Sequence, residues 1–308
     1  MAQTVETKAT TIDDRIERLS SASLKHVIEP DVEVPGEVRQ GQVIPDELLS
    51  ISGLDLDLTP EQRATLSREE VASITDAGVR FEAVLAAGFS ALIMEQRDLT
   101  DPKITYILHE MGEETRHSRL FIRLISQLQP KARNPLRPLL RTLRRMGLPT
   151  LLNKPALFCV LVLTGEEVPD LLQKRAVEHP GTDPFIRDLN RYHRAEEARH
   201  LQFGRMILPE LWERAGLFER FMIRRWAPWM MRGTVETLVH PGVYEVVGLP
   251  KWRTWWAANR TPRRVAFRHE ALRPVLKAVI DAGVLRRGRI PRRWRKVCGV
   301  DKHGNPVS

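Results

Sequence analysis

Three residues with metal-binding side chains share one face of a predicted helix, and they constrain the fold of this chain more than any other feature. His193, Glu197 and His200 stand at positions i, i+4 and i+7 of the segment 185–206, a spacing that places them on one side of an α-helix. Leu189 belongs to the same side, which is otherwise apolar. Because ionisable groups in a core position cost free energy unless they are paired or bind a metal, this face predicts a buried metal or polar site.

The same pattern occurs a second time, where Glu114 and His117 form another E-x-x-H sequence on an apolar helical stripe. Two E-x-x-H helices, each accompanied by a glutamate from a further helix, are the ligand pattern of di-iron carboxylate proteins built as four-helix bundles. We therefore predict an all-α chain. Its four core helices are expected at residues 68–97, 104–128, 151–177 and 185–206.

The two other core helices each offer a glutamate. In the first helix, Glu82 lies on the apolar stripe, whereas Glu95 lies about 220° round the helix from it. In the third helix, Glu166 and Glu167 are adjacent in a segment that is apolar on all sides. The pattern selects Glu82 over Glu95 but leaves Glu166 and Glu167 as alternatives.

A site for two metal ions needs about four carboxylates and at least two histidines, because carboxylates that bridge the metals hold them close together. The sequence supplies such a set as Glu82, Glu114, His117, Glu166, Glu197 and His200. His193 is then additional. It is either a third nitrogen ligand or a hydrogen-bond donor to a ligating carboxylate.

Four short segments of the chain resemble the AurF-type di-iron oxygenases, whose founding member is the p-aminobenzoate N-oxygenase. They are Glu82, E-E-T-R-H at 113–117, G-E-E at 165–167 and H-R-A-E-E-A-R-H at 193–200. The resemblance covers roughly residues 58–205, and its H-x-x-x-E-x-x-H element separates the family from ferritins and ribonucleotide reductase small subunits. It implies a ferritin-like four-helix bundle with additional helices. The ligands that it implies are Glu82, Glu114, His117, Glu166, His193, Glu197 and His200.

The resemblance also implies an activity. Members of the family hold two irons and use O₂ as a co-substrate to oxidise a small organic molecule, typically an aryl amine at its nitrogen. Because the sequence has no Rossmann or flavin fingerprint, the electrons are expected from an external reductase or ferredoxin. A hydroxylase or desaturase acting on carbon would use the same ligands, as would a non-catalytic, iron-binding ferritin-like protein. The ligand types are equally compatible with a manganese or a mixed manganese–iron centre.

Composition and charge suggest three parts. We expect an irregular segment at 1–57 that packs on the core, a di-iron helical bundle at 58–250, and a basic helical segment and tail at 251–308. The last part holds 16 Lys and Arg against 3 acids, and its net charge of +13 exceeds the net charge of +9 for the whole chain. Such a tail could bind nucleic acid, acidic lipid or an acidic redox partner. Without a recognised nucleic-acid-binding fold, a solvated basic rim is favoured and no nucleic-acid partner is expected.

The sequence also bears on location and assembly. The N-terminal segment is polar throughout and lacks the apolar core of a signal peptide. The longest apolar run, 156–163, is far too short to span a bilayer, and two cysteines make no disulfide framework. We therefore expect a cytoplasmic protein without a membrane span, and a homodimer as the commonest assembly.

Overall fold

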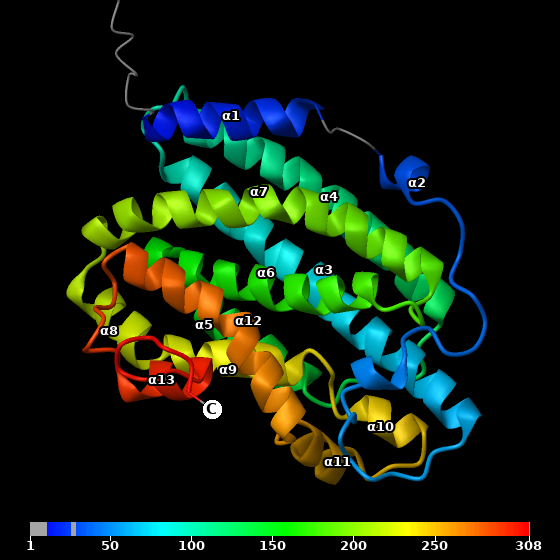
Figure 1. Cartoon of the computed structure of the whole chain (residues 1–308). Helices are drawn as coiled ribbons and strands as arrows, with labels where there is room; N and C mark the ends of the chain where they lie inside the picture. The colour runs from blue at the N-terminus through cyan, green and yellow to red at the C-terminus, as the bar shows by residue number, and fades with distance from the viewer. Residues whose placement is uncertain (1–10, 26–28, 308) are drawn as a thin grey trace, which may run out of the picture.

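The described part of the chain, residues 11–25 and 29–307 of this computed structural model, is helical apart from its loops and one isolated antiparallel bridge between Val300 and Pro306 (Figure 1). The predicted all-α, ferritin-like fold with additional helices is confirmed. Figure 1 shows the four long core helices as two pairs, in which α3 packs against α4 and α6 packs against α7, and the first pair runs diagonally behind the second. The core helices are α3 (Pro60–Glu95), α4 (Pro102–Leu128), α6 (Pro155–Glu178) and α7 (Pro184–Arg214).

Three of the core helices begin at side chains that cap them. The Thr59 hydroxyl accepts the Gln62 N–H, and the Gln62 side chain accepts the Thr59 N–H, so that a complete capping box starts α3. The helix therefore begins at Pro60 and not at residue 68. The carboxylates of Asp101 and Asp183 accept N–H groups in the first turns of α4 and α7.

Shorter helices surround the bundle. The prolines of residues 129–150 predict a connection that is not one continuous helix. It is non-helical only to Leu136 and then forms α5, because Pro138 occupies the first turn, where a missing N–H costs nothing. The surrounding elements are α1 (Ile12–Lys25), α2 (Pro30–Glu33), the 3₁₀ helix η1 (Asp46–Leu48), α5 (Arg137–Leu152), α8 (Leu217–Arg225), α9 (Ala227–Thr237), α10 (Gly242–Val246), α11 (Lys251–Ala258), α12 (Pro262–Asp281) and α13 (Arg292–Cys298).

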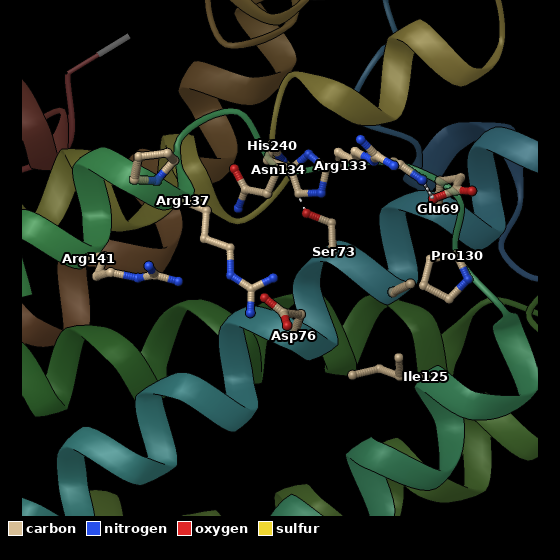
Figure 2. Close-up of a pocket in the computed structure, with 13 residues that line it drawn as sticks. Glu69, Ser73, Asp76, Ile125, Pro130, Arg133, Asn134, Arg137, Arg141 and His240 are labelled. Atoms are coloured by element: carbon tan, nitrogen blue, oxygen red, sulfur yellow. Dashed lines mark hydrogen bonds between the residues drawn. The ribbon is translucent and has the colours of Figure 1, made fainter.

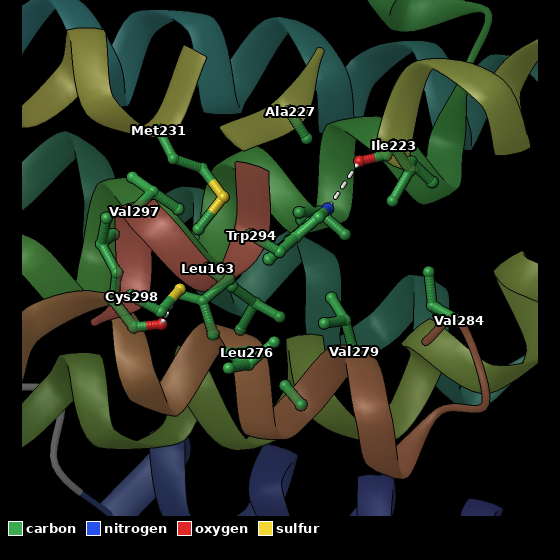
Figure 3. Packing of buried hydrophobic residues seen from close by; sticks show 14 of the residues in the cluster. Leu163, Ile223, Ala227, Met231, Leu276, Val279, Val284, Trp294, Val297 and Cys298 are labelled. Atoms are coloured by element: carbon green, nitrogen blue, oxygen red, sulfur yellow. Dashed lines mark hydrogen bonds between the residues drawn. The ribbon is translucent and has the colours of Figure 1, made fainter. Parts of the chain in front are cut away.

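The largest apolar cluster joins α6 to the C-terminal helices α12 and α13 (Figure 3). Trp294 is fully buried in this cluster, and its indole N–H donates to the carbonyl oxygen of Ile223 at 3.1 Å. Cys298 lies beside it and is a free, buried thiol. The C-terminal part of the chain thus contributes side chains to the same core as α6, on the outer side of the bundle.

A second apolar cluster packs the loop that precedes α3 onto α3, α4 and α7 through residues such as Val34, Val43 and Leu58. Of the predicted N-terminal segment 1–57, residues 1–10 and 26–28 lie outside the described residues. The division at residues 57 and 250 stays a prediction. By length and composition, α3 is the one helix in the described part of the chain that could cross a membrane, which is weak evidence because a core helix of a soluble protein meets the same criteria.

Candidate metal centre

The four core helices bring all seven predicted ligands to one buried place. At most 5% of the surface of each of these residues is exposed. α3 contributes one of them, α4 two, α6 one and α7 three. In chain order they are Glu82, Glu114, His117, Glu166, His193, Glu197 and His200.

Two carboxylates lie between two histidines. Glu114 places Oε2 3.3 Å from Nδ1 of His117 and Oε1 3.1 Å from Nδ1 of His200. Glu197 does the same from the opposite helix, with Oε1 3.2 Å from Nδ1 of His117 and Oε2 3.1 Å from Nδ1 of His200. Each carboxylate thus presents one oxygen to each histidine. This is the placement that carboxylates bridging two metal ions require.

The third histidine belongs to one half of this arrangement. Nε2 of His193 lies 3.3 Å from Oε1 of Glu197 and 3.7 Å from Oε1 of Glu82, and its ring lies 4.4 Å from the ring of His117. The other ring nitrogen, Nδ1, donates to Oε1 of Gln173 at 3.0 Å. Such a bond fixes the tautomer with Nε2 unprotonated and directed at the cluster.

The adjacent glutamates of α6 point in different directions. Burial raises the pKa of Glu166, and the negative charges of Glu197 and Glu114 raise it further. One of the Glu166 oxygens is buried without a hydrogen-bond partner. Glu167 is ion-paired with Arg205. The geometry favours Glu166 over Glu167 as the residue that faces the cluster.

Another buried carboxylate, Glu110, was not identified from the sequence. It lies one turn before Glu114 on α4, and its ligand atom is within 4.8 Å of those of Glu114 and His200. Its Oε2 has no hydrogen-bond partner, and burial raises its pKa to about 7. The i, i+4 spacing from Glu114 was the signal that could have found it.

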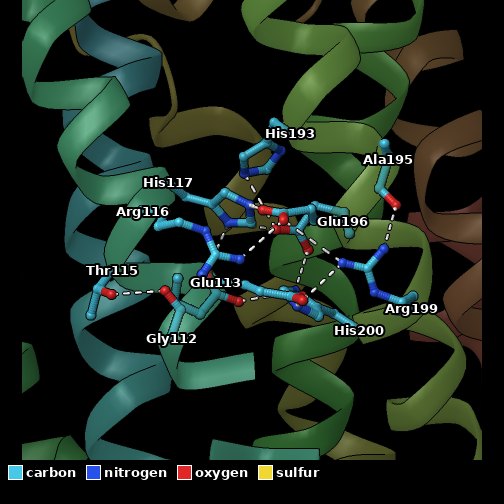
Figure 4. Close-up of polar contacts among 12 residues, drawn as sticks. Gly112, Glu113, Thr115, Arg116, His117, His193, Ala195, Glu196, Arg199 and His200 are labelled. Atoms are coloured by element: carbon cyan, nitrogen blue, oxygen red, sulfur yellow. Dashed lines mark hydrogen bonds and ion pairs between the residues drawn. The ribbon is translucent and has the colours of Figure 1, made fainter. Parts of the chain in front are cut away.

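The two E-x-x-H histidines are each held by a glutamate of the opposite helix (Figure 4). Nε2–H of His117 donates to Glu196 at 2.8 Å, and Arg116 donates to the other oxygen of Glu196 at 3.1 Å. Here an α7 carboxylate holds a histidine and an arginine of α4. It orients the imidazole so that Nδ1 faces the cluster.

The opposite corner repeats this arrangement. Nε2–H of His200 donates to Glu113 at 2.8 Å, and Arg199 donates to Glu113 at 2.8 Å. Sequence reasoning did not identify these supporting residues. The signal was present, because both helices carry E-E-x-R-H, at 113–117 and 196–200.

Protonation follows from the crowding of these groups. Burial opposes the charged imidazoles of His117 and His200, but hydrogen bonds to carboxylates and their charges raise the pKa of both well above the ordinary value. Burial and the charge of His117 lower the pKa of His193 to about 4. Burial alone would raise the pKa of Glu113, but His200 and Arg199 lower it to about 2.

The donor set fits metal ions. Buried atoms without a hydrogen-bond partner gather on the ligating side chains, although such atoms are normally satisfied. A donor set of carboxylates and three imidazoles suits iron or manganese, whereas a donor set rich in thiolate suits zinc. The unpartnered atoms are Oε2 of Glu82, Oε1 of Glu114, Oε1 of Glu166, Nε2 of His193 and Oε1 of Glu197.

An apolar cavity of about 280 Å³ reaches the cluster from one side, where Glu82, Glu166 and His193 form part of its wall. Gly165 matters to its shape, because a Cβ there would lie 2.2 Å from the ring of Phe81, which also lines the cavity. The glycine of the G-E-E segment thus makes room for this ring beside the cluster.

A second cavity, of about 530 Å³, lies between α3 and the start of α5 (Figure 2). Arg137 and Arg141 line it together with Asp76 and Glu69. Both acids have partners, because Asp76 pairs with Arg80 and Glu69 accepts two backbone N–H groups. None of the seven predicted ligands lines this cavity.

The chain is similar in sequence to one known family and to several known proteins. A family model described as P-aminobenzoate N-oxygenase AurF matches residues 9–283. Uncharacterized proteins from Mycobacterium bovis and Mycobacterium tuberculosis are each 28% identical to the chain over 209 residues. The alignment covers 67% of this chain and 57% of each relative, so the chain spans little more than half the length of these relatives.

Proposed function

This chain belongs to the p-aminobenzoate N-oxygenase AurF family, and from that premise we propose that it is a non-haem di-iron monooxygenase that uses O₂ to oxidise a small organic molecule. The reaction that we propose is N-oxygenation of an aryl amine. The observation that carries the proposal is the pair Glu114 and Glu197, each of which presents one oxygen to His117 and one to His200. Two such carboxylates suit two metal ions and not one.

The two irons would be held in two halves. Glu82, His117 and His193 form one group of potential ligands and Glu114, His200 and Glu110 another, with Glu197 between them. Glu166 is the last of the seven predicted ligands, and Glu110 is an eighth potential ligand. Bound there, the irons would supply the activation of O₂ and accept the electrons that this needs.

The remaining residues position the ligands and shape the site. Gln173 holds His193 in the tautomer that can bind a metal through Nε2. Glu196 and Glu113 hold the other two imidazoles. The cavity beside Glu82 would place an apolar substrate against this side of the centre and exclude water from it.

Partners and location are part of the same proposal. We propose that an external reductase or ferredoxin supplies the electrons, that the protein is cytoplasmic and that it forms a homodimer. Manganese, alone or with iron, is compatible with the same ligands.

One observation favours a second reaction. The cavity is lined mostly by apolar side chains, so that hydroxylation or desaturation at carbon fits the same space. A non-catalytic iron-binding protein is less well supported, because such a protein has no need of a substrate-sized cavity at its metal ligands.

Elemental analysis after reconstitution with Fe(II) tests the proposal. Two irons per chain and O₂ consumption with added reductant are expected for the wild type, and His193→Ala should lose O₂ consumption. Glu166→Gln should lose iron, whereas the matched Glu167→Gln, next to it but paired with Arg205, should keep two irons. Protein that binds no iron, or a wild type and His193→Ala variant that bind iron equally and ignore O₂, would overturn the proposal, and many irons per chain would indicate storage.

A further inference from the structure

The cavity at the candidate centre is long for its volume. Along α6 its wall extends from Glu166 to Ala176, about 15 Å at the rise of an α-helix. Its volume of about 280 Å³ is at the lower end for small-molecule sites. It therefore suits one slender molecule with one end at Glu82, Glu166 and His193.

The wall of this cavity carries no positive charge. Its only ionisable side chains are Glu82, Glu166 and His193, and neither lysine nor arginine is among its lining residues in the described chain. Two arginines close to the histidines, Arg116 and Arg199, are bound to the carboxylates of Glu196 and Glu113, and neither lines the cavity.

The hydroxyl groups of the wall are also unsuited to an anion. Thr75, Thr234 and Thr237 each donate their only hydroxyl proton to a carbonyl of their own helix, at 2.7 Å, 3.2 Å and 2.8 Å. They present lone pairs to the cavity. Amide N–H groups of Gln173 and Asn190 are the remaining side-chain donors among its lining residues.

A carboxylate is therefore costly along the wall of this cavity, away from the metal ligands. Burying an ionised carboxylate without a cation or several donors carries a large desolvation penalty. A neutral aryl amine does not pay this penalty, and its N–H groups can donate to the threonine oxygens.

We propose that the substrate of this protein is an uncharged, slender, mainly apolar molecule, and that an aryl amine is accepted only when its ring carries no carboxylate. The inference rests on the proposed function, because it describes the substrate of that reaction. It separates this chain's substrate from p-aminobenzoate, the compound in the description of its family.

Binding of two compounds that differ in one charge tests this. Iron-reconstituted full-length protein is titrated anaerobically, so that no turnover occurs, with 4-aminobenzoate and with its methyl ester, and binding is followed by calorimetry. We expect the ester to bind on the order of 100-fold more tightly than the acid. Equal binding, tighter binding of the acid, or no binding of the ester up to its solubility would overturn the proposal.

Variants that add a charge sharpen the test. Thr234→Arg and Leu172→Arg each place a cation in the cavity wall and should shift the preference at least tenfold toward the acid, whereas the neutral Thr234→Met should not. Arginine variants that fold, as judged by circular dichroism, and keep the wild-type preference would place the binding site elsewhere and overturn the proposal. Because this experiment measures binding, its outcome is separate from that of the iron and O₂ measurements. If those measurements failed, the oxygenase proposal would be rejected, and the preference of the protein for the ester over the acid could still be measured.

Discussion

Helix α3 buries Glu70 near its start and Glu82 three turns later, and the surroundings of the two carboxylates differ. Both oxygens of Glu70 are occupied, because Oε2 accepts the Ser50 N–H at 2.8 Å and Oε1 accepts the Ser50 hydroxyl at 2.5 Å. The Ser50 oxygen is also bonded to the Tyr244 hydroxyl at 2.8 Å. Glu82 has one oxygen without any hydrogen-bond partner and shares its surroundings with His193.

The comparison separates two uses of a buried acid. Glu70 ties the loop before α3 to α10, and Glu69 ties α3 to the backbone N–H groups of residues 131 and 132. Their carboxylates are satisfied by the protein itself, as buried polar groups usually are. Glu82 is not, and it lies among other acids in the same state. Burial alone therefore does not mark a site, whereas a cluster of unpartnered acceptors does.

The largest effects should come from removing each of these two carboxylates in turn. Glu70→Ala leaves the Ser50 N–H without its acceptor and opens a cavity, so that the free energy of unfolding should fall by about 4 kcal/mol while two irons remain bound. Glu82→Ala should weaken iron binding at least about 100-fold and cost much less stability, because no protein donor loses a partner. Denaturant unfolding and iron analysis of both variants measure this. Loss of iron in Glu70→Ala with normal stability would contradict the distinction.

The pH dependence of stability gives the next effect. Burial raises the pKa of Glu70 to about 7, against the Ser50 hydrogen bonds that lower it. Between about pH 4.5 and 7 the folded protein holds this proton and the unfolded chain releases it, so stability falls as pH rises across this window. The free energy of unfolding of the wild type relative to Glu70→Gln should drop by about 3 kcal/mol over the window and then stay level. A difference that is flat with pH would show that Glu70 is ionised throughout.

Sequence reasoning identified the groupings that a single helix determines. Glu114 and His117 share one face of α4, and Glu197 and His200 share one face of α7, whatever the rest of the fold, because i, i+3 neighbours lie on the same side of a helix. On α3 the same argument separated Glu82, which is buried, from Glu95, which is exposed. These are local consequences of helix geometry.

The residues that sequence reasoning missed depend on how the helices pack against one another. Glu113 and Glu196 stand one position before a ligand, about 100° away from the ligand face, and only the packing of α4 on α7 brings each to the histidine of the other helix. The choice of Glu166 over Glu167 likewise rests on where α6 faces, which an all-apolar helix does not reveal. The helix α5 was missed because its prolines lie in its first and last turns, where a helix tolerates them better than in its middle.

The smallest predicted effects lie within the centre, between its two halves. Glu113→Gln removes the charge that pairs with Arg199 and supports His200, so that iron affinity should fall ten- to a hundredfold. Glu196→Gln makes the same change behind His117.

The loss for Glu196→Gln should be smaller, because His193 gives the half that contains His117 a second nitrogen, whereas His200 is the only histidine in the other group. Competition with a chelator measures both affinities, and Thr115→Ala, an exposed change on α4, serves as the control that should bind iron normally. Equal losses in the two glutamine variants would mean that His193 adds nothing to its half. Its contact with Gln173 would then hold the α6–α7 pair together and leave the metal to the other six residues.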